Sequence, residues 1–146
     1  MRRIMLVGRT ECGKTTLIQA MKGKKIKYHK TQYINHYDVF IDTPGEYAEN
    51  RRLRAYLLGT SAETDVIGLV ISTTEPYPIY PPNLTSQINR DVVGIVSKCD
   101  HEVGDMEQAA EWLRLAGCTK IFFTSAVTGE GIEDLIAYLS TEDEPI

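Results

Sequence analysis

At 146 residues the chain has the length of a single domain, with little room for a second. Its hydrophobic fraction of 42% and charged fraction of 25% are typical of a soluble globular protein. No apolar run approaches the ~20 residues of a membrane-spanning helix, and a net charge of −4 gives no reason to expect nucleic-acid binding, so we expect neither a membrane nor a nucleic acid as partner.

Short apolar runs alternate with helical patterns in the first half of the chain. Residues 4–7 predict a buried strand, and residues 14–21 predict a helix that Gly23 ends. Residues 37–41 form a second apolar run, and residues 51–58 have a helical pattern. Because Arg2 and Arg3 lead directly into the first short run, we expect no signal peptide.

The second half continues the alternation. Residues 66–71 and 92–96 are rich in Val and Ile, as strands buried on both faces are. Asp105 and Gln108 have capping-box spacing, and Gly117 marks the end of the helix that follows them. After a short strand at 121–123, a last amphipathic helix is indicated by the spacing of Ile132, Leu135, Ile136 and Leu139.

This order predicts an α/β fold with a doubly wound, mostly parallel sheet and helices on both faces. We expect one domain over residues 1–140 and an acidic C-terminal tail over residues 141–146. In such sheets ligands bind beyond the carboxyl ends of the strands. The segments that follow Val7, Ile41, Val96 and Phe123 are therefore where chemistry is expected.

Two segments have unusual compositions. The lysine-rich run MKGKKIKYHK, residues 21–30, predicts a solvated loop, with a patch that attracts phosphate or a partner as the alternative. The run EPYPIYPPN, residues 75–83, has too many prolines for regular structure. We expect a stiff connecting loop there; the alternative is a docking surface made by Tyr77, Ile79 and Tyr80.

The strongest motif is GRTECGKTT, which has the spacing G-x-x-x-x-G-K-[ST] between an expected strand and an expected helix. Its glycines allow backbone N–H groups to face phosphates, Lys14 reaches the β- and γ-phosphates, and Thr15 places a hydroxyl on Mg²⁺. The helix N-terminus adds attraction for the anion. The predicted nucleotide-binding residues here are Gly8, Arg9, Thr10, Glu11, Cys12, Gly13, Lys14, Thr15 and Thr16.

A second motif, IDTPGEY (residues 41–47), lies at the end of the strand expected from the apolar run at 37–41. Asp42 would hold Mg²⁺ directly or through water, and the Gly45 amide would sense a γ-phosphate. Thr31 lies between the two motifs, so its hydroxyl would close over Mg²⁺, or else it is an ordinary loop residue. The predicted metal ligands are Thr15, Thr31 and Asp42.

The base is expected to be read by VVGIVSKCD, residues 92–100. One bidentate carboxylate, Asp100, accepts from the ring N–H and the exocyclic amine of guanine, while the Lys98 stem packs along the base. Ser97 stands where Asn or Thr is usual, and it can still tether the phosphate loop. With Ser125 and Ala126 after a later strand, these residues favour guanine over adenine; the alternative is a loop-capping Asp100 and an ATP site.

Together these motifs resemble the Ras-like GTPase superfamily. More narrowly, the segments RIMLVGRTECGKTTL, YHKTQ, IDTPGEYAENRRL, EPYPIYPPN and TSAVTGEGIEDL resemble the ethanolamine- and propanediol-utilization GTPase-like family, from Arg2 to about Leu139. The resemblance implies a cytoplasmic bacterial protein associated with metabolic microcompartments, with a shell or metabolic-enzyme partner. Cys12, Cys99 and Cys118 are odd in number and have no metal-ligand spacing, so we expect reduced thiols in a reducing compartment.

The chain departs from the Ras-like pattern in its first switch and at two side chains. Only 28 positions separate Lys14 from Asp42, so the first switch is short. Glu46 stands where Ras-like proteins have a water-orienting glutamine; it acts as a base or turns away from the phosphate charge. Glu11 stands where potassium-activated relatives have an asparagine ligand; it holds a cation or weakens phosphate affinity by repulsion.

Three functions fit these residues. The first is a slow GTPase with GTP/GDP and Mg²⁺ as cofactors and Lys14, Thr31, Gly45 and Glu46 as catalytic residues. An arginine that assists hydrolysis could come from this chain at Arg51, Arg52 or Arg54, although a solvated helix face is the simpler interpretation. The second function is an acetate-kinase-like phosphotransferase, a role also assigned within the family. The third is a non-catalytic interaction module that holds nucleotide as a structural ligand.

Overall fold

The structure is a computed structural model of the whole chain. It describes residues 2–9, 12–28, 40–42, 57, 59, 64–76 and 78–140, with only the backbone for residues 24–28, 40, 42 and 87.

A five-stranded parallel sheet forms the centre of the fold. Its strands are β1 (Ile4–Val7), β2 (Phe40–Asp42), β3 (Val66–Ser72), β4 (Asp91–Ser97) and β5 (Ile121–Phe123), in the spatial order β2-β1-β3-β4-β5. Every described pairing is parallel. All residues of β1 and β3 are buried, which explains why both runs are almost continuously apolar.

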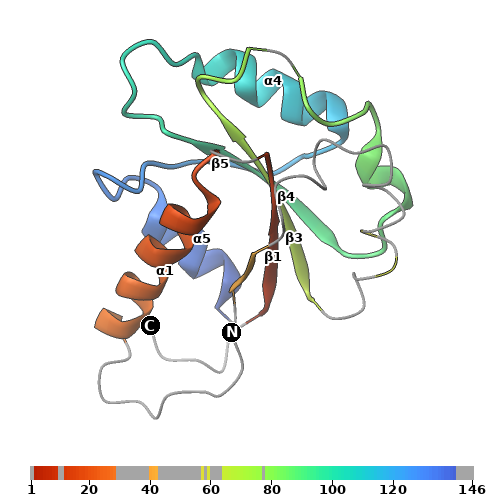
Figure 1. Cartoon of the computed structure of the whole chain (residues 1–146). Coiled ribbons are helices and arrows are strands. Elements are labelled where there is room, and N and C mark those ends of the chain that lie inside the picture. Colours follow the sequence, from red (N-terminus) through yellow and green to blue (C-terminus); the bar gives the residue numbers. More distant parts are fainter. Residues whose placement is uncertain are drawn as a thin grey trace.

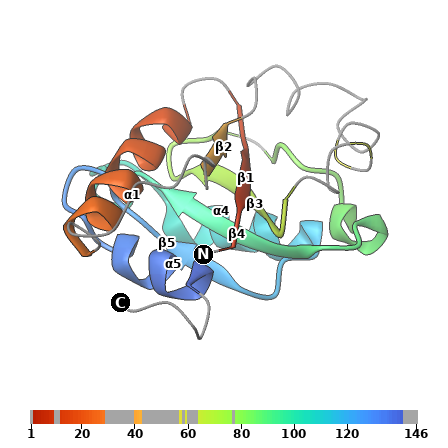
Figure 2. The same cartoon turned by 90° about the horizontal axis from the view of Figure 1, so that it is seen from below.

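Helices cover both faces of this sheet. Helices α1 (Lys14–Tyr28) and α5 (Ile132–Leu139) pack against each other on one face, and α4 (Met106–Ala116) covers the other (Figure 1). A view turned by 90° again places α1 beside α5 (Figure 2). A short 3₁₀ helix, η2 (Leu84–Gln87), lies in the connection between β3 and β4. The α/β, doubly wound, parallel fold predicted from the sequence is therefore confirmed.

Each face of the sheet has its own hydrophobic core, because successive side chains of a strand point to opposite faces. The core under α1 and α5 includes the fully buried residues Ile4, Leu6, Leu17, Met21, Ile132 and Leu135. The core under α4 includes Met5, Val7, Ile67, Leu69, Ala109 and Leu113. Full burial of each large aliphatic side chain contributes about 1.5–3 kcal/mol relative to leaving it exposed.

Helix α4 begins and ends where its capping residues predict. The Asp105 carboxylate accepts a hydrogen bond from the Gln108 backbone N–H at 3.0 Å. Gly117, at φ 111°, ends the helix in the left-handed conformation that favours glycine. In α5 the predicted apolar stripe is also confirmed, since Ile132, Leu135, Ile136 and Leu139 are all buried.

Helix α1 corrects the expected end at Gly23, because it continues to Tyr28. A glycine inside a helix costs about 0.5–1 kcal/mol relative to alanine, which the surrounding lysines, good helix formers, can offset. The solvated-loop interpretation is therefore wrong for residues 22–28. His29 and Lys30, at the end of that run, lie outside the described residues.

The remaining expected elements are only partly described. Strands β3 and β4 extend the predicted ranges to Ser72 and to Asp91–Ser97. Of the apolar run at 37–41, the structure describes residues 40 and 41, which lie in β2. The helix expected at 51–58 lies outside the described residues except for Leu57, which is fully buried. The tail at 141–146 also lies outside them, and no helix in the described part is long and apolar enough to cross a membrane.

The described residues of the proline-rich segment between β3 and η2 form no helix or strand, as predicted, and Tyr80 fixes the segment to the sheet. Tyr80 is 6% exposed, and its hydroxyl lies 2.9 Å from the Val7 carbonyl oxygen and 2.7 Å from that of Val70. Burial raises its pKa well above the usual value, so it remains a donor. Ile79 is half-buried against the same core. The alternative prediction, a docking surface that presents Tyr80, is therefore wrong. Tyr77 lies outside the described residues.

We predict that Tyr80→Phe lowers the free energy of unfolding by about 1–2 kcal/mol, because two buried carbonyls lose their shared donor while the ring remains. Urea unfolding measures the change. Tyr138→Phe is the matched control, since the structure gives the Tyr138 hydroxyl no hydrogen bond to a described residue while its ring packs against Phe122. Equal stability of Tyr80→Phe and the control would contradict the anchoring role.

Candidate functional site

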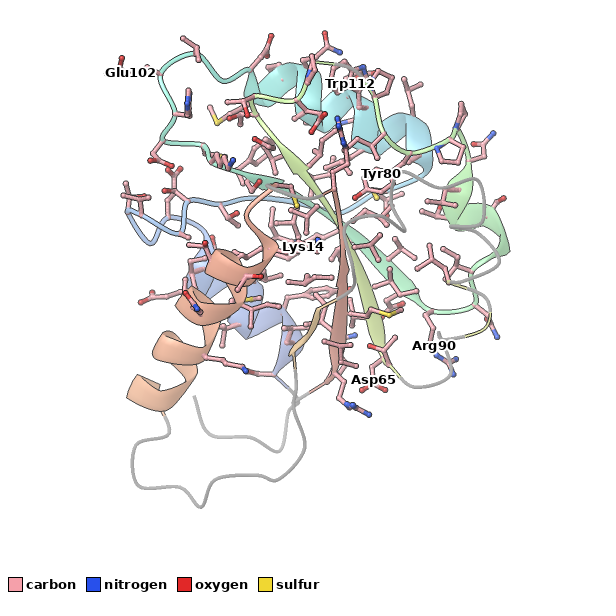
Figure 3. All side chains as sticks on the ribbon, in the orientation of Figure 1. Lys14, Asp65, Tyr80, Arg90, Glu102 and Trp112 are labelled. Carbon is pink, nitrogen blue, oxygen red and sulfur yellow. The ribbon has the colours of Figure 1, made fainter. Side chains whose placement is uncertain are left out.

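The site lies at the carboxyl edge of the parallel sheet. The segments after β1, β3, β4 and β5 meet there because all these strands run in one direction. Figure 3 shows Lys14 at the start of α1 and Tyr80 in the connection that follows β3, with Glu102 beyond this edge; Asp65 and Arg90 lie at the opposite end of the sheet.

Glycines allow the loop between β1 and α1 to curl tightly. A Cβ added at Gly8 would lie 2.6 Å from Cys12 Sγ and 3.1 Å from the Val70 carbonyl oxygen, so no larger residue fits without a shift. Gly13 has a φ of +93°, which other residues rarely adopt. The Cys12 N–H donates to the Arg9 carbonyl at 3.2 Å, within the loop. This is the backbone curl that a phosphate-binding loop requires.

Positive charge at the end of this loop comes from Lys14 and from the N-terminus of α1. Lys14 is 7% exposed, and its Nζ donates to the Gly8 carbonyl at 2.8 Å, so its ammonium group lies across the loop. Thr15 and Thr16 are exposed in the first turn of α1, which contains no acidic residue. The helix N-terminus, its backbone donors and Lys14 therefore all favour an anion at this position.

An ion pair joins the phosphate loop to the segment after β3. Arg9 Nη1 contacts Glu75 Oε1, and their side chains are 26% and 9% exposed. Since little of the Glu75 side chain is exposed, the contact with Arg9 compensates part of the cost of removing its carboxylate from water. Arg9, predicted as a nucleotide-binding residue, thus also holds the neighbouring loop.

Ser97, at the end of β4, makes the expected hydrogen bond to the phosphate loop, although its side chain is short. Its Oγ donates to the Cys12 carbonyl at 2.7 Å, and the side chain is 4% exposed. The following residue, Lys98, has a φ of +60°. Its Cε lies 3.7 Å from where a Gly13 Cβ would stand, so the lysine stem packs against the phosphate loop.

The two segments predicted to bind the base meet through a side-chain hydrogen bond. Ser125 Oγ donates to Asp100 Oδ1 at 2.7 Å and accepts from the Thr128 N–H at 3.1 Å. Ser125 is buried, Ala126 is half-buried beside it, and Asp100 is exposed. Ser125 therefore fixes one oxygen of a carboxylate whose remaining acceptor positions face solvent, as a base-reading group requires.

Cys99 and Cys118 are not activated nucleophiles. Cys12, Cys99 and Cys118 are all free thiols. Burial raises the pKa of Cys99 and raises that of Cys118 to about 12, so both remain protonated at neutral pH.

Part of the predicted site lies outside the described residues. These are Thr10, Glu11, Thr31, Gly45 and Glu46, together with Arg51, Arg52 and Arg54. Of Asp42 only the backbone is described; it pairs in register with Leu6, beside the strand that leads into the phosphate loop. A threonine hydroxyl and a carboxylate at this edge are oxygen donors of the kind that Mg²⁺ prefers.

Sequence reasoning missed Thr73, Glu75 and the role of the Tyr80 hydroxyl. Thr73 donates through Oγ1 to the Lys98 carbonyl at 2.8 Å, and Glu75 pairs with Arg9. The sequence contained a signal for a site at this position, because polar residues directly follow the buried run at 66–71. The rule that ligands lie after parallel strands applies to β3 as it does to the other strands.

A glycine-rich loop between a buried parallel strand and a helix, with Lys14 and Thr15 at its end, defines an α/β protein of the P-loop NTPase class. The fold matches the G-domain of FeoB from Methanococcus jannaschii, with a TM-score of 0.62, 19% identity and 94% of each chain covered. That likeness concerns the fold alone.

The chain belongs to the PduV-EutP family, described as "Ethanolamine utilisation - propanediol utilisation", whose model matches residues 1–141. It is 42% identical to the propanediol utilization protein PduV of Citrobacter freundii, over 98% of this chain and 96% of that protein. It is 30% identical to the probable acetate kinase EutP of Salmonella typhimurium, over 99% of this chain and 92% of that protein. The family resemblance of the sequence motifs is thereby confirmed.

We predict that Ser97→Ala lowers the free energy of unfolding by about 1–3 kcal/mol, because a buried hydrogen bond from the Ser97 hydroxyl to the Cys12 carbonyl is lost. Thermal or urea unfolding measures the loss. Ser86→Ala is the control: the exposed Ser86 Oγ donates to the Asn83 carbonyl at 2.8 Å, where water can replace it. If both variants unfold alike, the contact between β4 and the phosphate loop is not a stabilising tether.

Proposed function

We propose that this protein binds guanine nucleotide with Mg²⁺, hydrolyses GTP slowly and acts in ethanolamine or propanediol utilisation at a bacterial microcompartment. The observation that carries the proposal is the Asp100 carboxylate held by Ser125, two residues from a lysine that packs on the phosphate loop. A bound nucleoside diphosphate would need a fixed acceptor for its base and an aliphatic surface beside the phosphate loop, so these two contacts support the proposal.

Guanine fits this acceptor better than adenine does. Guanine presents a ring N–H and an exocyclic amine side by side, and one carboxylate accepts from both. Adenine presents an unprotonated ring nitrogen at the corresponding position, which an ionised carboxylate repels. Asp100 is exposed, so its free oxygen positions are accessible to a ligand.

The phosphate half is supported by the geometry around Lys14. Its buried ammonium group and the first-turn N–H groups of α1 would neutralise the β- and γ-phosphates. Thr15 and Asp42, with Thr31, would hold Mg²⁺, which supplies further charge neutralisation when bound. Nucleotide affinity would then depend on both halves, which the Ser97 hydrogen bond connects.

Hydrolysis is proposed to be slow, with Lys14 stabilising the charge on the transferring group. The Gly45 amide would contact the γ-phosphate, and Glu46 would orient water. Without a supplied arginine, turnover on the order of 10⁻³ s⁻¹ or less is expected from the precedent of intrinsic Ras activity.

A second candidate is phosphoryl transfer to a short carboxylic acid. It is favoured by the printed description of the EutP relatives as probable acetate kinases. The phosphate loop suits either reaction, since both proceed by positioning and charge stabilisation of a phosphoryl group. The fixed Asp100 favours the first candidate, because an ATP-using kinase has no need of a guanine acceptor.

Asp100→Asn is predicted to weaken GDP binding about 100-fold while leaving ADP affinity unchanged, because an amide cannot accept both guanine hydrogens. Xanthosine diphosphate, which carries a carbonyl in place of the exocyclic amine, is expected to bind the variant better than the wild type. Titration of each nucleotide with Mg²⁺ measures these affinities. Asp91→Asn, the same change at the opposite end of β4, is the control. Equal wild-type affinity for GDP and ADP would overturn guanine recognition.

The two reactions differ in their products. Wild-type protein with GTP and Mg²⁺ is expected to release inorganic phosphate whether or not acetate is present, and Lys14→Ala is expected to abolish that release. Hydroxylamine trapping detects acetyl phosphate. If trapped product appears with acetate and either ATP or GTP, and phosphate release without acetate is absent, the kinase candidate replaces the GTPase.

A further inference from the structure

We propose that Thr73 is a positioning residue that sets the guanine selectivity of the site by holding the segment 97–105 (the base loop) in shape. The inference rests on the proposed function, since it concerns how Asp100 is aimed at the base. Thr73 follows β3 directly and is 5% exposed. It lies outside every motif that predicted the nucleotide site.

Hydrogen bonds from Thr73 reach both ends of the base loop. Its backbone N–H donates to the Ser97 carbonyl at 3.1 Å, and its Oγ1 donates to the Lys98 carbonyl at 2.8 Å. Its own carbonyl accepts from the Asp105 N–H at 2.9 Å. Asp105 is the N-cap of α4, so one buried threonine joins the end of β4 to the start of the next helix.

The Thr73 hydroxyl binds the carbonyl of a residue whose backbone conformation is unfavourable. Lys98 adopts a φ of +60°, a conformation that costs a non-glycine residue of order 1 kcal/mol or more. Its carbonyl direction is fixed by Thr73 Oγ1 and by the His101 N–H, which donates to it at 3.0 Å. Because Asp100 lies two residues further on, a change in the Lys98 peptide turns the Asp100 carboxylate relative to Ser125 and to the base.

Close packing leaves the hydroxyl little freedom. A Cβ added at Gly104 would lie 2.1 Å from Thr73 Oγ1 and 2.5 Å from Thr73 Cβ. Gly104 therefore permits the approach of the base loop to Thr73. Gly104→Ala would displace the same contact while leaving the hydroxyl in the chain, and so it tests the geometry by a second chemical change.

The experiment compares GDP, inosine diphosphate, ADP and inorganic pyrophosphate as competitors for a fluorescent GDP. Inosine diphosphate lacks only the exocyclic amine, so the GDP-to-IDP affinity ratio reports the Asp100 contact, whereas pyrophosphate reports the phosphate loop. Thr73→Val is expected to weaken GDP binding about three- to tenfold and to lower that ratio, with pyrophosphate unchanged. Thr73→Ser is expected to restore the ratio, and Gly104→Ala to lower it.

Thr64→Val is the matched control, because Thr64 is a buried threonine at the other end of β3 whose Oγ1 donates to the Arg3 carbonyl at 2.8 Å. It is expected to lower the melting temperature without changing the ratio. The fold of Thr73→Val is expected to survive, since the Lys98 carbonyl keeps its bond from His101; if it does not, the ratio measured on Gly104→Ala decides.

The outcomes separate the two proposals. A wild type that binds GDP and ADP equally overturns guanine recognition and, with it, the role of Thr73. A wild type that prefers GDP, with an unchanged GDP-to-IDP ratio in Thr73→Val and Gly104→Ala, overturns only the positioning role. A lowered ratio that Thr73→Ser restores supports it.

Discussion

The hydrogen bond from Ser97 to the Cys12 carbonyl is the contact on which the rest of the site depends. It is buried, and it connects the two halves that a nucleotide must bridge, the loop after β1 and the loop after β4. A serine is shorter than the asparagine usual at this position, so the backbone of β4 must approach the phosphate loop closely. Gly8 leaves room for Cys12 and for Val70 of β3, and the Lys98 stem packs beside Gly13.

The loop after β3 is the structural partner of both halves. Thr73 holds the base loop, Glu75 pairs with Arg9, and Tyr80 hydrogen-bonds the carbonyl of Val7 just before the phosphate loop. In a parallel sheet β3 lies between β1 and β4, so its carboxyl end is the natural place for side chains that reach both neighbours. The central strand thus contributes support, while its neighbours carry the groups expected to contact nucleotide.

Local patterns predicted much of this fold. The β1 strand, the Asp105 cap and the stripe of α5 could be assigned from neighbouring residues alone, because burial and capping act over a few positions. The local rule failed at Gly23, where helical neighbours outweigh one unfavourable residue. In the site, the phosphate loop and Asp100 could be assigned from the sequence because each belongs to a short motif with fixed spacing between its residues. Tyr80 and Thr73 act across the fold on residues 73 and 25 positions away, and no sequence period encodes such pairs.

The Tyr80 hydroxyl lies between carbonyls of β1 and β3, and it belongs to a segment whose described prolines are exposed. Anything that pulls this segment outward must remove the tyrosine from the strand that leads into the phosphate loop. Thermodynamic linkage makes such an effect reciprocal. If displacement of the segment weakens the affinity of the phosphate loop for a ligand, the bound ligand opposes the displacement by the same free energy. The hydrogen bonds of one phenol group therefore join the proline-rich segment to the strand that leads into the phosphate loop.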